Sequence, residues 1–303
     1  MNRRTFSRKL AGATLGSAAL ASVPLARAAS ETPQSSVGEA PFKISIMIWT
    51  VFHGRPFEER LEKVAEAGYR AVELVNEATS WTEDDFRRYN QKRRELGITI
   101  DTTCALRHGA GDPSVREGFL ADVRANLKIM EKIECSTLNV MSGNVLPGVA
   151  PEVQHASCVE GLKRAAELVE GTGVTLLIEN IDLEENPHYY MWSVPEAFKI
   201  IEEVNHPQVK LLYDLYHAQI SGGNLIANLE RHFDKVGLFH IADVPGRHEP
   251  GTGEINYLNI YRKLAELNYQ RYVAMEFFPT GDPIKILAHA REQALQAAQT
   301  PRS

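Results

Sequence analysis

The sequence predicts an α/β protein of the (β/α)8 barrel class, the TIM barrel, and three observations support this prediction. From residue 42 onward, the 303-residue chain alternates short β-rich runs with amphipathic segments. The β-rich runs are almost continuously apolar, which is typical of parallel strands that are buried on both faces. Eight such units in roughly 260 residues agree with the size and the strand count of a closed barrel.

Each β-rich run is expected to form one strand, because it is short, apolar and bounded by polar segments. The runs are residues 44–48, 71–75, 98–104, 137–141, 174–180, 209–214, 236–242 and 272–278. A doubly wound open sheet is the alternative for such an alternation, but it usually has a glycine-rich dinucleotide-binding turn after its first strand. Here the first run is followed by "WTVFHGRPF", which is not such a turn.

The segments between the runs predict helices. The segment "FEERLEKVAEAG" (57–68) repeats apolar residues at helical spacing and ends in a glycine. Residues 115–133 and 155–173 follow the same pattern. We expect a helix after every strand, so that the barrel domain spans residues 42–300.

The first 29 residues are expected to be a twin-arginine export signal. Arg3 and Arg4 precede a weakly apolar run of small residues, and the "ARAAS" that follows fits the small-residue cleavage rule. The run is too short and too polar for a transmembrane helix. Residues 30–41 are predicted to be a polar linker. We therefore expect an exported, periplasmic protein without a membrane segment in its mature form; a basic arm or an uncleaved anchor is the alternative.

The composition excludes some partners and leaves others open. Apolar residues make up 44% of the chain, which is enough for a sizeable core, and the net charge of −6 does not favour nucleic acid or an anionic membrane. Cys104, Cys135 and Cys158 have no metal-type spacing, and their odd number gives no disulfide framework. We expect them to be small buried side chains. The oligomeric state stays open, a homo-oligomer included.

Four successive strands carry a potential metal ligand near their carboxyl ends. They are Glu179 on the fifth strand, Asp214 on the sixth, His240 on the seventh and Glu276 on the eighth. In a barrel these ends meet at the mouth where the chemistry takes place. Three buried carboxylates would repel one another unless a cation lies between them. Carboxylates with one imidazole suit Mn²⁺, Mg²⁺, Co²⁺ or Zn²⁺; a structural polar residue bonded to the backbone is the alternative for any one of them alone.

The two glutamates of this set predict proton transfer. Glu179 and Glu276 lie on the fifth and eighth strands, so they can approach a bound substrate from opposite sides. A metal can polarise a carbonyl and stabilise the enediolate that forms when a neighbouring C–H bond is deprotonated. One carboxylate then removes the proton, and the other returns a proton at the adjacent carbon or on the other face.

Several segments of the chain carry a family resemblance. They are "AGYRAVEL", "LLIENI" with "NPHYY", "DLYHAQISGGNL", "HIADVPGRHEPGTGEINY" and "AMEFFP", and they lie between residues 43 and 285. Through them the chain resembles the hydroxypyruvate isomerase family, within the xylose isomerase-like TIM-barrel superfamily. The "GRHEP…GEINY" loop with "YHAQ…GNL" is specific to that family, whereas the metal-binding carboxylates are shared across the superfamily.

The resemblance implies roles for the site residues. The four strand-end residues would hold the metal, and the two glutamates among them would transfer the proton. His217 and Arg247 would bind substrate oxygens, and the planar guanidinium of Arg247 suits the carboxylate of hydroxypyruvate. His188 follows the fifth strand and Glu73 lies on the second, so both are further substrate-binding candidates, with loop packing and a structural ion pair as their alternatives.

The loop "HIADVPGRHEPGTGEINY" carries more ionisable groups than a connection between a strand and a helix needs. We expect its proline and glycine residues to turn Arg247 toward the mouth. His248 and Glu249 are expected to have partners within the loop. Glu254 is expected to favour the start of the next helix, because an acidic group stabilises a helix N-terminus.

The chain also departs from the family. Bacterial isomerases of the family carry glutamine where this chain has His240, and a histidine there is more like the ketose 3-epimerases of the superfamily. The loop "CALRHGAGDPSVRE" after the third strand is shorter than the isomerase version, and those isomerases lack an export signal. These departures bear on the substrate more than on the scaffold.

We therefore expect a metal-dependent isomerase of the hydroxypyruvate isomerase type, which converts hydroxypyruvate to 2-hydroxy-3-oxopropanoate. A sugar isomerase or ketose 3-epimerase is the alternative. A phosphodiesterase or abasic-site endonuclease would need a multi-zinc cluster, and the first four predicted strands hold no histidine. The pair of glutamates disfavours a sugar-binding protein without activity. The expected partner is a small hydroxy-keto acid or sugar, with no nucleic acid.

Overall fold

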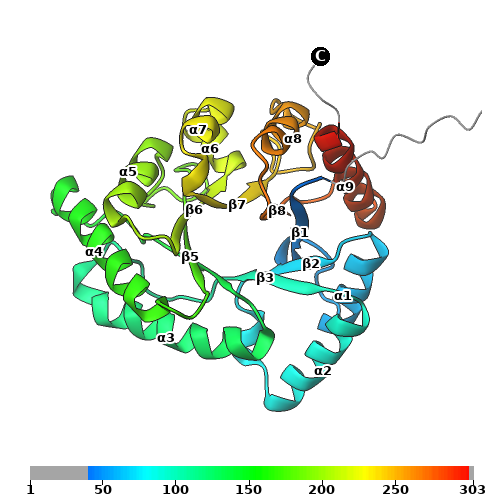
Figure 1. Ribbon diagram of the computed structural model, residues 1–303, viewed down its shortest axis with the longest axis horizontal. Coiled ribbons are helices and arrows are strands. Elements are labelled where there is room, and N and C mark those ends of the chain that lie inside the picture. Colours follow the sequence, from blue (N-terminus) through cyan, green and yellow to red (C-terminus); the bar gives the residue numbers. More distant parts are fainter. Residues whose placement is uncertain (1–39, 300–303) are drawn as a thin grey trace, which may run out of the picture. The chain divides into compact units, whose positions relative to one another are not determined.

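The computed structural model describes residues 40–299, so the predicted export signal and nearly all of the predicted linker lie outside the described residues. Residues 40–299 form a closed barrel in which the strands follow one another in chain order, and β8 pairs in parallel with β1. Helices surround the strands on the outside (Figure 1). The predicted (β/α)8 barrel is confirmed. No helix in this part of the chain has both the length and the apolar character to cross a membrane.

Each predicted run corresponds to one strand of the barrel. The strands are β1 (Lys43–Met47), β2 (Ala71–Leu74), β3 (Thr99–Thr103), β4 (Thr137–Val140), β5 (Thr175–Glu179), β6 (Val209–Asp214), β7 (Val236–Ile241) and β8 (Tyr272–Met275). The last strand is shorter than predicted, so Glu276 follows β8 instead of lying within it. Its N–H still donates to the carbonyl of Ile241 at 3.0 Å, which keeps this residue at the end of the sheet.

The outer ring consists of the helices that follow the strands (Figure 1). They are α1 (Phe57–Glu66), α2 (Glu83–Glu95), α3 (Arg116–Ile133), α4 (Pro151–Val169), α5 (Val194–Val204), α6 (Leu215–Ser221), α7 (Leu225–Arg231), α8 (Tyr257–Glu266) and α9 (Pro283–Gln299). The helices predicted within 57–68, 115–133 and 155–173 are confirmed. The third of them begins earlier than predicted, at Pro151, because proline is well suited to the first turn of a helix.

The core has two parts. The larger part fills the space between the strands and the helices. The smaller part lies inside the barrel and consists of Leu177, Leu212, Leu238 and Ala274. Of the three cysteines, Cys135 and Cys158 are buried as predicted, whereas Cys104 is partly exposed, and all three are free thiols.

Candidate active site

The alternation of side chains along the strands places the four predicted ligands together. Glu179, Asp214, His240 and Glu276 each stand two positions after a member of the small core inside the barrel. Because the side chains of a strand repeat every second residue, all four also point into the barrel, one layer closer to its mouth. All four are buried, and one ligand atom from each lies within 4.8 Å of the others.

His240 lies in the middle of this cluster. Its Nδ1 atom is 2.7 Å from Glu276 Oε2, 3.2 Å from Glu179 Oε1 and 3.7 Å from Asp214 Oδ2. His240 Nδ1 and Glu276 Oε2 are buried and make no hydrogen bond of acceptable geometry, although they approach each other closely. Two buried polar atoms without hydrogen bonds are costly, and a cation between them would satisfy both. Three carboxylates and one imidazole are also a suitable ligand set for a divalent ion, so the cluster is compatible with a metal site.

The charges at the mouth influence one another. Burial alone would raise the pKa of Glu276, but His240 and Arg247 together hold it below its usual value. Burial opposes ionisation of Asp214 as well, and His217, His240 and Arg247 still keep the pKa of Asp214 well below its usual range. Burial lowers the pKa of His217, but the charge of Asp214 and the hydrogen bond to Asp182 together outweigh it and raise the pKa to about 9. At neutral pH these two carboxylates are therefore ionised and His217 is protonated.

Arg247 points into the mouth from the loop between β7 and α8, as predicted. Its Nη2 atom is 2.9 Å from Glu276 Oε1, and its Nη1 atom is 2.6 Å from Glu185 Oε2. The guanidinium lies over the rings of Tyr216 and Trp49, at 5.2 Å and 5.9 Å from their centroids. Both aromatic faces and both carboxylates therefore hold the guanidinium in one place.

Asp243 organises this loop, a role that the sequence did not indicate. Its fully buried carboxylate accepts hydrogen bonds from the N–H groups of Val244, Gly251, Gly253 and Ile255, at 2.8–3.0 Å. At Gly253 a Cβ atom would lie 2.0 Å from the carbonyl oxygen of Val244, so this position requires glycine. The loop thus folds around one buried acidic side chain, and this fold presents Arg247 to the mouth.

His248 and Glu249 tie the loop to the segment after β8. His248 Nδ1 lies 2.8 Å from the carbonyl oxygen of Phe278. Glu249 accepts hydrogen bonds from the N–H and the hydroxyl group of Thr280, at 3.1 Å and 2.5 Å. The expected partners within the loop are therefore replaced by partners in the next loop of the barrel.

Glu254 does not begin the following helix. The N-cap of α8 is Asn256, whose side chain accepts a hydrogen bond from Asn259 N–H. Glu254 instead accepts a hydrogen bond from Gln219 Nε2 at 3.1 Å. The expectation for Glu254 is wrong, because the uncharged amide two residues later provides the cap.

Of the two predicted histidines outside the ligand set, the structure brings one to the site. His217 lies on α6, where Nδ1 is hydrogen-bonded to Asp182 and Nε2 is 3.5 Å from Asp214 Oδ2. His188 is exposed in the loop after β5, and its backbone carbonyl accepts a hydrogen bond from Val145 N–H at 2.7 Å. The side chain of His188 is not part of the buried cluster of Glu179, Asp214, His240 and Glu276. Substrate binding and its alternative, loop packing, therefore both stay predictions for His188.

Glu73 lies on β2 and is fully buried. Its Oε2 atom is 2.9 Å from His240 Nε2, the ring nitrogen that faces away from the cluster. The imidazole therefore stands between Glu73 and the other carboxylates. This arrangement does not favour the expected contact between Glu73 and the substrate. It indicates that Glu73 acts on the site through its hydrogen bond with His240.

Three further residues contact the cluster or lie close below it. Asn139 Nδ2 donates a 2.7 Å hydrogen bond to Glu179 Oε2, and Trp49 Nε1 donates a 3.2 Å hydrogen bond to Glu276 Oε1. Asp101 is buried on β3, where burial raises the pKa of its carboxyl well above the usual value. Asn139 and Asp101 are polar residues in apolar runs, the same signal that identified the four ligands. Trp49 has no such signal, because a tryptophan after a strand is usually part of the core.

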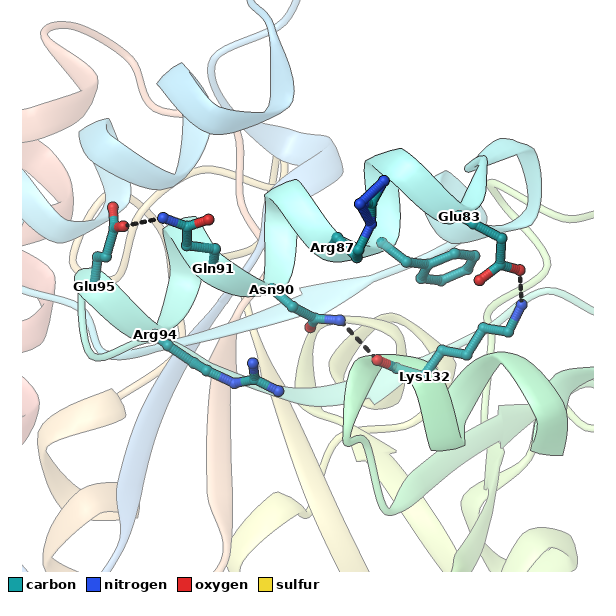
Figure 2. Close-up of a pocket in the computed structure, with 8 residues that line it drawn as sticks. Glu83, Arg87, Asn90, Gln91, Arg94, Glu95 and Lys132 are labelled. Carbon is teal, nitrogen blue, oxygen red and sulfur yellow. Dashed lines mark hydrogen bonds and ion pairs between the residues drawn. The ribbon is translucent and has the colours of Figure 1, made fainter.

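A second region with many charges lies on the outer surface, in a groove between α2 and α3 (Figure 2). The residues that line it are Glu83, Phe86, Arg87, Asn90, Gln91, Arg94, Glu95 and Lys132. Glu83 is ion-paired with Lys132, and Gln91 Nε2 donates to Glu95 Oε1 at 2.8 Å. The charges of this groove are paired and exposed, so the barrel mouth is the better candidate for catalysis.

A parallel barrel with a buried set of carboxylates and one imidazole at the carboxyl ends of its strands is typical of a (β/α)8-barrel enzyme. The sequence profile of the family described as xylose isomerase-like TIM barrel matches residues 61–299. The chain belongs to this family.

Relatives and solved structures agree with this assignment. The chain is 30% identical to hydroxypyruvate isomerase of Escherichia coli K12, over 78% of this chain and 93% of the relative. It is 28% identical to 2-oxo-tetronate isomerase of Pectobacterium atrosepticum, over 79% and 93%. A crystal structure named AP endonuclease, family 2, from Brucella melitensis has a TM-score of 0.73 and 28% identity, over 83% of this chain and 98% of that one. The similarity to the two isomerases places the chain among the isomerases, as predicted.

Proposed function

We propose that this protein is a metal-dependent isomerase that moves a carbonyl group between adjacent carbons of a short hydroxy-keto acid. The observation that supports it best is the buried cluster of Glu179, Asp214, His240 and Glu276, in which a nitrogen and a carboxylate oxygen approach within 2.7 Å without a hydrogen bond. Hydroxypyruvate is the leading substrate, with 2-hydroxy-3-oxopropanoate as the product. It shares a keto group beside the carboxylate, and a hydroxyl on the next carbon, with 2-oxo-tetronate.

The ligand set suits a divalent ion such as Mn²⁺, Mg²⁺, Co²⁺ or Zn²⁺. Such an ion supplies Lewis-acid polarisation of the substrate carbonyl. The protein fixes the orientation of both glutamates: Asn139 donates a hydrogen bond to Glu179, and Trp49 donates one to Glu276. Fixed carboxylates are the groups that a positioned proton transfer requires.

The glutamates carry out the proton transfer. One glutamate acts as a base and takes a proton from C3, and the carboxyl group of the other returns a proton at C2, while the proton of the C3 hydroxyl group passes to the oxygen on C2. Glu276 is available as the base, because His240 and Arg247 outweigh its burial and keep its carboxyl group ionised. Exchange with water then restores both glutamates to their starting protonation states, so a solvent proton enters the product.

Arg247 and His217 bind the substrate oxygens in this proposal. Arg247 presents a planar pair of N–H groups that suits a carboxylate, and the rings of Trp49 and Tyr216 limit its movement. His217 is protonated near neutral pH, since Asp214 and Asp182 together raise its pKa to about 9 against the effect of burial. A second cation beside Arg247 favours an anionic substrate.

A ketose 3-epimerase or sugar isomerase is the second candidate, and one observation favours it. Arg247 is already paired with Glu276 and Glu185, at 2.9 Å and 2.6 Å. Much of its charge is therefore neutralised before a substrate binds, which suits an uncharged sugar better than a carboxylate. The imidazole of His240 in the ligand set points in the same direction, through the resemblance to ketose 3-epimerases.

Solvent deuterium incorporation tests the proposal and separates the candidates. The metal-loaded enzyme is incubated in D₂O with hydroxypyruvate, with 2-oxo-tetronate and with a panel of free ketoses, and products are analysed by NMR and mass spectrometry. Label in the products of the hydroxy-keto acids supports the first candidate. Label in ketoses alone favours the epimerase, and no label with any compound overturns the proposed proton transfer. Glu276→Gln, loaded with the same metal, is the matched control for label that arises without the enzyme's base.

A further inference from the structure

The carboxylate of Glu73 and the imidazole of His240 form a buried pair inside the barrel. Glu73 Oε2 is 2.9 Å from His240 Nε2, and each side chain is only 1% exposed. β2 and β7 are not neighbours in the barrel, so this contact crosses its interior. The opposite nitrogen, His240 Nδ1, faces the carboxylates of Glu179, Asp214 and Glu276.

We propose that Glu73 is a positioning residue for the metal ligand His240. Glu73 accepts a hydrogen bond from Nε2–H, which leaves Nδ1 unprotonated and directed at the cation. A metal-binding histidine typically donates its other ring N–H to such a partner, which fixes both the tautomer and the ring orientation. The inference rests on the proposed metal site and deepens it, because it assigns a function to a carboxylate that binds neither metal nor substrate.

The surroundings of Glu73 favour this role over a purely structural one. A buried carboxylate that serves only the fold is normally satisfied by several donors, because an unpaired buried charge is costly. Here Glu73 Oε1 has no hydrogen-bond partner within residues 40–299, and the contact with His240 is made by the other oxygen. The carboxylate is therefore poorly suited to stabilise the fold and well placed to orient one ring.

A change of Glu73 to glutamine should disturb the tautomer of His240. The amide oxygen of glutamine can still accept from Nε2–H, but the amide nitrogen can donate to Nε2 when the group is flipped. In that second arrangement the proton of the ring moves to Nδ1, where it blocks the metal. Glu73→Asp keeps the charge but withdraws it from Nε2 by one methylene group. Both variants should therefore weaken the metal site, by different routes.

The test is a comparison of metal affinity, with Co²⁺ and Mn²⁺ as probes. Dissociation constants are measured by competition with a chelator for the wild type, Glu73→Gln and Glu73→Asp, and the visible spectrum of bound Co²⁺ is recorded. We expect about 10- to 100-fold weaker binding in both variants, with an altered Co²⁺ spectrum. Thermal unfolding of the metal-free proteins checks that each is folded, and Glu73→Asp carries the test if Glu73→Gln is not.

Two controls separate orientation of His240 from the general loss of a buried acidic side chain. Asp101→Asn replaces another buried acidic side chain, on β3, which is hydrogen-bonded to Ser45. It should change metal affinity much less than Glu73→Gln does. In a His240→Gln background, Glu73→Gln should have little further effect, because the ring that it orients is gone.

The outcomes are distinct for the two proposals. If the wild type binds neither probe, the proposed metal site is wrong. If the wild type binds and Glu73→Gln and Glu73→Asp bind equally well with an unchanged Co²⁺ spectrum, Glu73 does not position His240. The inference is also overturned if Glu73→Gln and Asp101→Asn lose the same amount of metal affinity. It is overturned likewise if Glu73→Gln weakens metal binding as much in the His240→Gln background as in the wild type.

Discussion

The barrel mouth and the groove between α2 and α3 both contain many charged residues, but in opposite settings. In the groove, the side chains of Lys132 and its partner Glu83 are 43% and 78% exposed (Figure 2). At the mouth, the side chains of Arg247 and its partner Glu276 are 11% and 7% exposed. Exposed pairs contribute little to stability, whereas buried charges depend strongly on their partners.

The difference indicates which charges serve the fold and which serve chemistry. In the groove, acidic and basic side chains lie beside one another, and water screens their charges. The mouth gathers acidic groups around few cations, with Nδ1 of His240 and one oxygen each of Glu73 and Glu276 left without a hydrogen bond. Such an arrangement reduces stability, so its retention is explained by function. Four predictions test this contrast.

The largest effect is expected for Glu276→Gln. The amide keeps the shape of the side chain but cannot accept a proton, so kcat should fall on the order of 10³-fold. The melting temperature of the metal-free protein should fall by several degrees as well, because Arg247 and His240 lose a buried carboxylate partner. Steady-state kinetics and thermal unfolding measure both quantities.

The matched control for this prediction is Glu83→Gln in the groove, which removes the same charge from an exposed pair. It should alter neither kcat nor the melting temperature appreciably. A Glu276→Gln variant with near wild-type turnover would contradict the proposed proton transfer.

The sequence was sufficient to predict the barrel and the buried cluster at its mouth, for a common physical reason. Buried parallel strands appear in the sequence as apolar runs. A polar residue near the end of such a run either points into the mouth of the barrel or is buried without partners, which costs free energy. Glu179, Asp214 and His240 stand inside their strands, and Glu276 directly after one. Asp101 followed the same pattern and was missed, because it lies one layer deeper than the strand ends.

A second large effect is expected for Arg247→Met. Methionine keeps an apolar chain between Trp49 and Tyr216 but leaves the carboxylates of Glu276 and Glu185 without their cation. Removal of one partner from a buried ion pair costs about 3 kcal/mol, so the melting temperature should fall by several degrees. KM for hydroxypyruvate should rise as well.

Lys132→Met in the groove is the matched change. This variant also removes an ion pair, the one between Lys132 and Glu83, but that pair is exposed to water. The melting temperature of Lys132→Met should shift by less than about 2 °C. If Arg247→Met and Lys132→Met lowered the melting temperature equally, the buried charges of the mouth and the exposed charges of the groove would not differ in their contribution to stability.

An intermediate effect is expected for Asp243→Asn. The amide has one acceptor oxygen where the carboxylate has two, so part of the set of N–H groups from Gly251, Gly253 and Ile255 loses its acceptor. The loss should be about 1–3 kcal/mol in the free energy of unfolding. Because the loop presents Arg247, KM should rise more than kcat falls.

Asp282→Asn is the control for this variant. Asp282 accepts N–H groups at the exposed start of α9, from Ile284 and Lys285, and asparagine caps a helix nearly as well. It should leave KM unchanged. An Asp243→Asn variant whose KM is unaltered would show that the loop does not hold Arg247 in place.

The loops explain most of what the sequence did not reveal. The role of Asp243 depends on a chain path that brings the N–H groups of residues 8, 10 and 12 positions later back to its carboxylate. No local pattern encodes such a path. His188 lies nine residues after the end of β5, and its side chain is exposed in the loop. The contact between Glu73 and His240 crosses the barrel, so it depends on closure and register, which single runs do not specify.

The smallest effect belongs to His155, a charged residue of the outer ring. His155 on α4 bridges Glu196 and Glu203, at 2.5 Å and 2.9 Å. Burial lowers the pKa of His155, but the two glutamates outweigh it and raise the pKa above the usual 6.5. Since the folded-state pKa is the higher one, the stabilisation is complete below about pH 6.5 and is lost as the pH rises through the raised value.

His155→Gln should therefore lower the melting temperature most between about pH 5 and 6.5, and progressively less at higher pH. Turnover at fixed pH should stay unchanged, because the bridge lies between helices of the outer ring. Glu203→Gln removes one of the two carboxylates and should reduce the pH dependence without abolishing it. If the difference in melting temperature were constant across this pH range, His155 would stabilise the protein through packing and not through its charge. The outer ring would then differ from the mouth in exposure alone.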